Sequence, residues 1–348
     1  MSRTLAVVVA LAQMGVLAFM AIQRESVERT GHIIYLRTAP VDPSSPMRGE
    51  YLALSYEISQ VPRALCRDGV AQWFDAKGLQ RSHRDQRVYA ALATDANGLA
   101  ELVSLSDRPP AGSPYLRARV VGVVDNPGYV RLRYGLEAFF VEEGAAKTFE
   151  DDRRKNEAGV PLDMEVAVSE SGMAVLRGYR YEPLGVRLIA DPVARPPAAA
   201  GRAGQRTGIA GVTVEIKNHS DKPVAILTWP LRLISNRQRS SNHYRWVGED
   251  GPPRMPAPED VMVLQPGENF RQHLDLTFPD WFVVDTTAKG SASAPVALGT
   301  LLNAWDASFC IEYAPPDAKE CADFPHADII WHGHLPSRAF GPAAGSID

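Results

Sequence analysis

The sequence predicts a mainly β protein that follows a single N-terminal transmembrane helix. An uncharged apolar run of 18 residues extends from Leu5 to Ile22. Beyond it, helical periodicity nearly vanishes. Short runs rich in Val, Tyr, Phe, Leu and Ile alternate with Gly, Pro, Asp and Asn, which is the composition of strands and turns. We therefore expect one helix, then a β-rich domain, and then a second, immunoglobulin-like β-sandwich domain.

The apolar run is just long enough to cross a hydrocarbon core as a helix. Gln13 is its only strongly polar residue, and the segment is apolar on every face. Arg3 precedes the run, so the positive-inside rule mildly favours a cytoplasmic N-terminus and an exported remainder. A cleaved signal peptide is the alternative, although the run is long for its core. A buried core helix fits less well, and we expect a transmembrane helix over 5–22 within a segment 1–30.

Length and composition set the remaining bounds. A chain of 348 residues predicts two globular domains after the anchor. Hydrophobic residues make up 45% and charged residues 22%, as in folded proteins. The net charge of -4 provides no overall basic field, so we expect no nucleic-acid partner.

The first domain is expected over residues 31–190. Asp95-Ala96-Asn97-Gly98 has hairpin chemistry, because Asn and Gly tolerate positive φ, and 125–128 forms a second such turn. Its predicted strands are Ile33–Leu36, Tyr51–Ile58, Arg87–Thr94, Leu116–Val124, Leu136–Val141, Met164–Val168 and Ala174–Tyr179.

A Pro, Ala and Gly segment over 191–207 is the predicted linker. The second domain is expected over 208–340, with a disordered tail at 341–348. Its predicted strands are Val212–Lys217, Val224–Thr228, Leu231–Ser235, Tyr244–Val247, Val261–Leu264, Phe270–Thr277, Phe309–Tyr313 and Ile329–His332. Their spacing, with turns between them, is typical of a β-sandwich.

Residues 38–43, Thr-Ala-Pro-Val-Asp-Pro, precede the run Gly49-Glu50-Tyr51-Leu52-Ala53-Leu54-Ser55-Tyr56. This pattern resembles the signature of the GDYXXLXY family of bacterial membrane-associated proteins, with Glu50 in place of Asp. The resemblance covers about residues 31–190 and implies a bacterial membrane-associated protein. Together with the orientation of the apolar run, it leads us to expect a single-pass inner-membrane protein whose bulk is periplasmic or extracytoplasmic. It implies no activity.

Five residues of this motif, Gly49, Glu50, Tyr51, Leu54 and Tyr56, are candidate site residues of unknown role. Gly49 permits a tight turn before a strand. A structural role, with Glu50 accepting hydrogen bonds and the tyrosines anchoring a sheet, is favoured over a ligand-binding or catalytic carboxylate.

Glu137, Glu142 and Glu143 surround an aromatic strand. Paired carboxylates at a suitable separation serve as acid and base on a glycosidic bond, or as oxygen ligands for Ca²⁺. The alternative, which we favour, is a solvated charged loop.

Cys310 and Cys321 flank a turn-rich stretch, and an oxidising compartment would allow a disulfide between them. Three cysteines without a bridge are an equal alternative. His326, His332 and His334 form a weak candidate metal site, because three imidazoles suffice for zinc. We favour solvent-facing strand histidines, and expect no metal and no cofactor.

Five tryptophans fall in the second domain. They suit either a sandwich core or a stacking platform for sugars, and we favour the core. The residues are Trp229, Trp246, Trp281, Trp305 and Trp331.

The sequence therefore favours a non-catalytic interaction or assembly module at the membrane, held through Leu5 to Ile22, with another envelope protein as its partner. An envelope hydrolase of the peptidase or glycosidase class, using the acidic or His residues, is one alternative. A carbohydrate-binding module built on the second-domain aromatics is the other.

Overall fold

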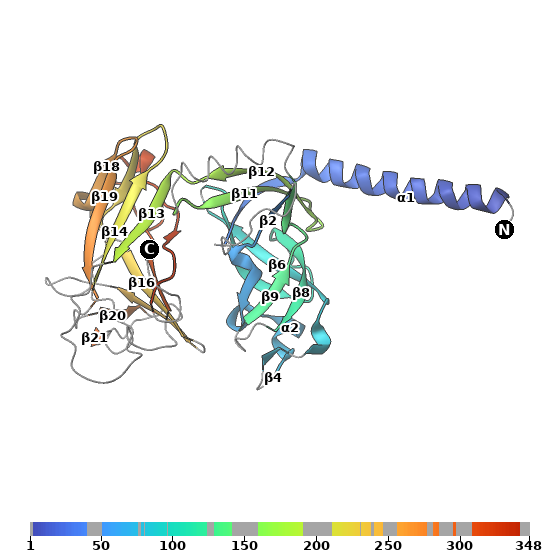
Figure 1. Ribbon diagram of the computed structural model, residues 1–348, viewed down its shortest axis with the longest axis horizontal. Helices are drawn as coiled ribbons and strands as arrows, with labels where there is room; N and C mark the ends of the chain where they lie inside the picture. Colours follow the sequence, from blue (N-terminus) through green and yellow to red (C-terminus); the bar gives the residue numbers. More distant parts are fainter. Residues whose placement is uncertain are drawn as a thin grey trace, which may run out of the picture. The chain divides into compact units, whose positions relative to one another are not determined.

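The structure is a computed structural model that divides into two compact units (Figure 1). The first unit is Met1–Thr148 with Leu162–Arg180, and the second is Phe149–Pro161 with Tyr181–Asp348. Both are built mainly from strands, which confirms the predicted fold class. The described residues are 3–39, 51–75, 78–79, 81–95, 97–123, 129–140, 159–190, 211–229, 231–237, 240–245, 256–276, 281–284, 295–296 and 308–341.

Helix α1 (Arg3–Thr30) extends beyond the apolar run at its C-terminal end. Its segment Val7–Thr30 has a mean hydropathy of 1.7 and none of its most apolar window is buried, so it is long and apolar enough to cross a membrane. The turns of α1 that follow the apolar run, residues 23–30, are mostly polar. They are stabilised by the Arg29 to Glu25 ion pair at 2.7 Å, one helical turn apart.

The first unit contains a three-stranded and a five-stranded sheet. The three-stranded sheet has the order β1 (His32–Arg37), β11 (Leu162–Val168), β12 (Ala174–Tyr181). The five-stranded sheet has the order β3 (Gln60–Pro62), β9 (Tyr129–Arg133), β8 (Tyr115–Val123), β6 (Arg87–Thr94), β7 (Ala100–Ser106).

Smaller elements complete this unit. Two strand pairs are β2 (Tyr51–Ala53) with β10 (Ala138–Phe140), and β4 (Phe74–Asp75) with β5 (Gly78–Leu79). The short helices are α2 (Asp68–Gln72), η1 (Glu57–Ser59), η2 (Arg63–Leu65) and η3 (Arg81–His83).

The predicted hairpin between β6 and β7 is confirmed. Asp95 Oδ1 accepts hydrogen bonds from the backbone amides of Asn97 and Leu99, both at 2.8 Å, and Gly98 has φ +76°. The predicted strand Tyr51–Ile58 is wrong in its second half, because β2 ends at Ala53 and a 3-10 turn begins at Glu57. The predicted turn at 125–128 lies outside the described residues.

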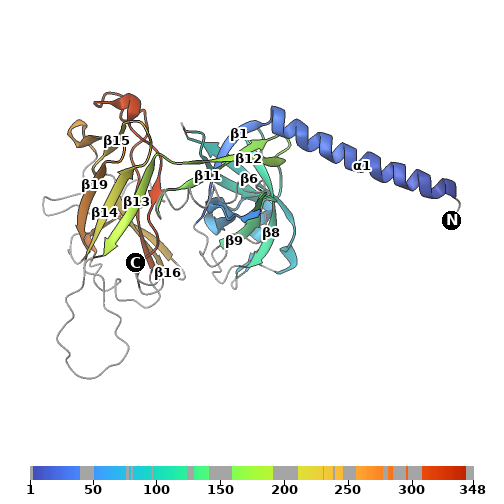
Figure 2. The same cartoon turned by 45° about the horizontal axis from the view of Figure 1, so that its top comes forward.

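The second unit contains two larger sheets and one strand pair. Figure 2 shows β13 (Leu184–Ala190), β14 (Gly211–Asn218) and β19 (Asn269–Asp275) side by side. The six-stranded sheet has the order β21 (Pro295–Val296), β20 (Trp281–Val284), β17 (Ser240–Arg245), β16 (Leu231–Arg237), β22 (Ser308–Tyr313), β23 (Leu335–Pro336). The strand pair is β15 (Val224–Leu227) with β18 (Val261–Leu264), and the short helices are η5 (Pro258–Asp260) and η6 (Ala327–Ile329).

The two larger sheets of this unit share one hydrophobic core. Val186 and Val214 from the first sheet and Leu233, Phe309 and Ile311 from the second are all buried in the same cluster. Sheets that bury one face each against a common core are the layers of a sandwich. The immunoglobulin-like character of this sandwich stays a prediction.

Strand β13 lies inside the sequence-derived first domain, yet it belongs to the second unit. It pairs with β14 along its whole length, from Leu184 opposite Asn218 to Ala190 opposite Val212. The division between the units falls between Arg180 and Tyr181, ten residues before the expected boundary at residue 190. The predicted linker at 191–207 lies outside the described residues, as does 342–348 of the predicted tail.

Candidate functional site

The described part of the GDYXXLXY-like signature, residues 51–56, begins with the short strand β2 and is held by the segment around residues 134–140. β2 pairs with β10 in an antiparallel register, with Tyr51 opposite Phe140. Leu54 is buried, and its amide donates to the Glu137 carbonyl at 2.9 Å. Tyr56 is fully buried, and its hydroxyl donates to the Leu136 carbonyl at 2.6 Å. Burial, with a smaller contribution from Glu137, raises the pKa of the Tyr56 phenol well above its usual value.

The Glu137 carboxylate closes the turn that presents these carbonyls. Its two oxygens accept hydrogen bonds from the amides of Tyr134, at 2.6 Å, and Gly135, at 2.9 Å. Gly135 has φ +81°, a backbone conformation that glycine adopts without steric cost. This geometry gives Glu137 a structural role. Gly49, Glu50, Glu142 and Glu143 lie outside the described residues.

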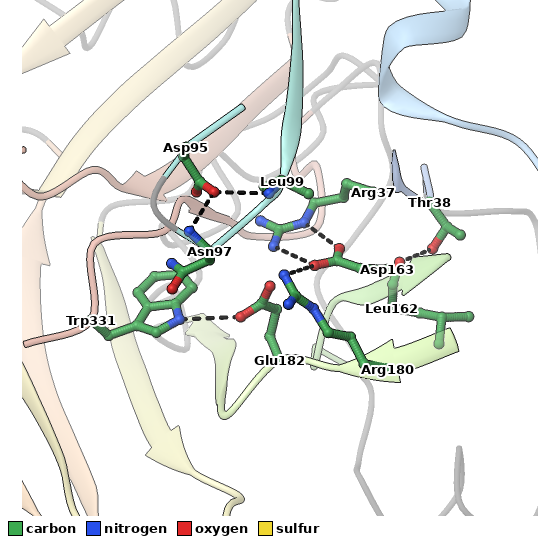
Figure 3. Close-up of polar contacts among 10 residues, drawn as sticks. All are labelled: Arg37, Thr38, Asp95, Asn97, Leu99, Leu162, Asp163, Arg180, Glu182 and Trp331. Carbon is green, nitrogen blue, oxygen red and sulfur yellow. Dashed lines mark hydrogen bonds and ion pairs between the residues drawn. The ribbon is translucent and has the colours of Figure 1, made fainter. Parts of the chain in front are cut away.

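The most deeply buried charges of the first unit form a cluster across the three-stranded sheet (Figure 3). Arg37 on β1 lies directly opposite Asp163 on β11, and its Nε is 3.0 Å from Asp163 Oδ1. The Arg180 guanidinium, on β12, lies 3.5 Å from Asp163 Oδ2. Asp163 is completely buried and Arg37 almost so. One carboxylate thus joins arginines from both neighbouring strands.

Two further contacts fix this ion cluster. The Arg180 guanidinium lies 3.5 Å from the centre of the Tyr35 ring, a cation–π geometry. Beside Arg37, the amide and the hydroxyl of Thr38 both donate to the Leu162 carbonyl at 2.9 Å. A buried carboxylate held by two guanidiniums is suited to fixing the register of the sheet, because a slip by one residue would leave these charges without partners.

Sequence reasoning missed this cluster. Its only sequence signal is an acid or an arginine within each of the apolar strands 32–37 and 162–168. Arg37 and Asp163 are 126 positions apart, so local periodicity cannot pair them.

Of the two alternatives for the cysteines, the structure has the one without a bridge between Cys310 and Cys321. Cys310 lies on β22 opposite Ile234, whereas Cys321 is buried in a separate cluster with Ala225, Leu227 and Ile330. The two cysteines therefore pack within different parts of the second unit, which favours the unbridged alternative.

The three candidate histidines do not form a metal site. The Nδ1 of His332 is 2.9 Å from the Pro316 carbonyl oxygen, and that of His334 is 3.5 Å from a Glu312 carboxylate oxygen. His326 is exposed at the start of η6. Among the residues that the structure describes, no three His, Cys, Asp or Glu side chains gather as a set of metal ligands.

The described second-domain tryptophans favour the core over a sugar platform. Trp281 and Trp331 are buried, and Trp229 is half-buried. The Trp331 indole stacks on Tyr313. Its N–H donates to Glu182 Oε2 at 3.1 Å (Figure 3). Trp246 and Trp305 lie outside the described residues.

Comparison with known proteins gave one match. No curated protein and no solved structure matched the chain. The family model described as GDYXXLXY protein matches residues 13–178, which begin within α1 and end on β12, the last strand of the first unit. This match confirms the resemblance seen in the signature, and it extends the resemblance into α1, from residue 13 onward. Residues 13–178, just under half of the chain, are therefore similar to the GDYXXLXY family.

Proposed function

We propose that this chain is a single-pass inner-membrane protein whose β-rich units lie outside the cytoplasm, where they bind another envelope protein without catalysing a reaction. The observation that carries the proposal is the joint between α1 and the first unit. Val27, in the last part of α1, is buried against Ala167 of β11 and Val175 of β12.

No spacer separates the helix from the sheet. Gly31 is the only residue between α1 and β1. A Cβ at Gly31 would lie 2.5 Å from the Val27 carbonyl oxygen and 3.0 Å from the Val168 amide nitrogen. The backbones therefore approach closely because position 31 has no side chain. Gln23–Thr30 add about 12 Å of helix after the apolar run, at 1.5 Å per residue. A helix in the bilayer would therefore hold this unit close to the membrane surface in a set orientation.

An interaction role is supported by the edge of the five-stranded sheet. β7 is the last strand in that sheet, and Val103 on it is 51% exposed. Its two ends are covered, since the Tyr35 amide donates to the Gly98 carbonyl, in the turn just before β7, and the Arg67 amide donates to the Leu105 carbonyl. Between these ends the register of β7 against β6 shifts at Val103, and we propose that this short stretch of the edge receives an extended segment of another chain.

Photo-crosslinking in intact cells tests the proposal. Benzoylphenylalanine replaces Val103 on β7 in one variant and Met262, exposed on β18, in a control variant. A discrete crosslinked envelope protein at position 103 that is absent at position 262 is the expected result. The same products at both positions, or none at position 103, would contradict a partner at this edge. Carbonate extraction of the membranes tests the anchor separately, and release of the chain would refute it.

A further inference from the structure

The outer face of the five-stranded sheet in the first unit concentrates arginines. Along β6, β8 and β9, the buried positions Val88, Ala118 and Leu132 alternate with outward-facing positions. The outward set, which we call the arginine face, consists of Arg87, Arg117, Arg119, Arg131 and Arg133.

Three of these arginines stand side by side on neighbouring strands. Arg87 is opposite Arg119, and Arg119 is opposite Arg133, and all three are exposed. Directly opposite residues of an antiparallel pair have Cβ atoms about 5 Å apart, where like charges are destabilising. A row of three guanidiniums at this spacing is a position where an anion would lower the free energy of the folded chain.

The described residues supply little negative charge to this row. The Asp85 carboxylate lies 3.8 Å from the Arg133 guanidinium and forms an ion pair with it. The backbone carbonyl of Asp85 accepts a hydrogen bond from the Arg119 guanidinium at 2.8 Å. Glu101 is opposite Ala93 at the far end of β6, about 20 Å from Arg87 along the strand. In addition, the Nε of Arg117 is buried without a hydrogen-bond partner. The face therefore has more donors and positive charge than acceptors.

The arginine face begins beside the exit of the anchor helix. The amide of Arg117 donates to the Gly172 carbonyl at 2.9 Å. The next residue, Met173, packs against the cluster that holds Val27 of α1. Arg119 follows about 7 Å further along β8. The start of the face is thus joined to the end of the anchor through a single turn of chain.

Two tyrosines accompany the arginines at this end. Tyr89, opposite Arg117, packs edge-to-face against Tyr115, with ring centres 5.6 Å apart. Both are half-buried. Tyrosine is enriched at membrane–water interfaces, because its ring is apolar and its hydroxyl is polar.

We propose that the arginine face binds the phosphate groups of anionic lipids in the membrane that holds α1. This inference rests on the proposed membrane anchoring and adds a ligand class to it. Arginine suits phosphate, because its planar guanidinium donates two parallel hydrogen bonds. We favour lipid headgroups over free phosphate as the ligand. The anchor holds Arg117 beside the bilayer, where the local concentration of headgroups is high.

Lipid binding to the full-length chain tests this proposal. The chain is purified in neutral detergent with equal amounts of phosphatidylglycerol and phosphatidylcholine of matched acyl chains, and bound lipid is counted by native mass spectrometry. The test variant is Arg87→Gln/Arg119→Gln/Arg133→Gln. The control variant, Arg187→Gln/Lys222→Gln/Lys319→Gln, removes the same charge from exposed positions of the second unit.

Wild type and control are expected to prefer phosphatidylglycerol, and the test variant to lose at least ten-fold in apparent affinity for it. A basic residue near an anionic surface contributes about 1 kcal/mol, so three together amount to on the order of 100-fold. Added salt should weaken the preference by screening. Equal binding of the two lipids by wild type, or a preference retained by the test variant, would overturn the proposal.

Competition identifies the source of the phosphate. Full displacement of phosphatidylglycerol by excess inorganic phosphate would indicate that the face binds a free anion. Displacement by a single-stranded oligonucleotide would indicate that it binds nucleic acid. Either result overturns the lipid assignment. Carbonate extraction keeps the two proposals apart. A chain released by carbonate refutes the anchor, whereas a chain that is retained but lacks lipid preference refutes only the arginine face.

Discussion

Asp163 shows how much of the first unit depends on single side chains. Its carboxylate is wholly buried and joins Arg37 and Arg180, which lie on the two flanking strands. Removing one member of a buried ion cluster leaves the others desolvated and without their partner, which costs far more than the loss of an exposed pair.

We expect Asp163→Asn to lower the free energy of unfolding by about 3–5 kcal/mol, because the buried Arg37 would lose the carboxylate charge that it contacts. Denaturant titration of the full chain measures the change. Glu165→Gln is the matched control on the same strand, since Glu165 is 30% exposed and 3.7 Å from Arg177. It should cost less than about 1 kcal/mol. Equal losses in both variants would contradict a special role for Asp163.

Tyr56 carries the second prediction at this scale. Tyr56→Phe removes the hydroxyl that donates to Leu136 and keeps the buried ring, so the expected loss is about 1–2 kcal/mol. Tyr129→Phe, on the half-buried Tyr129, should leave the unfolding transition unchanged. A neutral Tyr56→Phe would show that the signature does not depend on this hydrogen bond.

The buried thiol of Cys66 should make the folded chain less stable at alkaline pH. Burial raises the pKa of its thiol from 9.0 to about 11, against the lowering effect of Arg67 and Arg63. Between these two values the unfolded chain releases the proton and the folded chain retains it. The free energy of unfolding should therefore fall as pH rises through this window. Cys66→Ala should flatten that part of the slope, and native Cys66 should resist iodoacetamide at pH 8. Rapid alkylation there would contradict the burial.

At the scale of single elements, the sequence predicted that a helix or strand exists better than it predicted where that element ends. The apolar run identified α1, but only the Arg29–Glu25 pair and the packing of Val27 explain why the helix continues to Thr30. Alternation predicted a strand over 51–58, yet the structure ends it at Ala53, where Leu54 and Tyr56 turn to contacts with the segment 134–140. Tertiary partners decide such ends, and a local pattern does not contain them.

The joint between α1 and β1 provides a test at this scale. Gly31→Ala places a methyl group against the Val27 carbonyl and the Val168 amide, both backbone atoms. The expected destabilisation is about 1–3 kcal/mol, seen as a lower melting temperature and faster tryptic cleavage at Arg29. Gly15→Ala is the control, because nothing lies within 4 Å of the added methyl group. Unchanged cleavage at Arg29 would argue against a tight joint.

At the scale of the whole molecule, composition predicted a β-rich chain that follows an apolar helix. It did not predict where the charges lie in the fold, because a net charge is a sum over the whole chain. The net charge of -4 excluded an overall basic field. It could not show that Arg87, Arg119 and Arg133 share one row, because these residues come from three strands spread over 47 positions. The buried Arg37–Asp163 pair was hidden for the same reason.

β13 was expected in the first domain but belongs to the second unit, and this placement predicts how the molecule responds to proteolytic cleavage of the chain. Cleavage within 191–207 would separate β13 from β14 in the covalent chain, while seven residue pairs still hold the strands together. The two fragments should therefore co-elute in size-exclusion chromatography under native conditions and separate only in denaturant. Fragments that separate without denaturant would contradict this pairing.

The pairing of β1 with β11 also constrains how the chain matures. A ribosome delivers residues 32–37 long before residues 162–168, so the first strand after the anchor has no partner during most of the synthesis of its unit. Under the proposed anchoring, β1 lies at the bilayer surface through this interval, before the strand that pairs with it has been made. Under the proposed export, we expect incomplete chains that end before residue 162 to depend on periplasmic chaperones, and chains extended past residue 181 to be released from them.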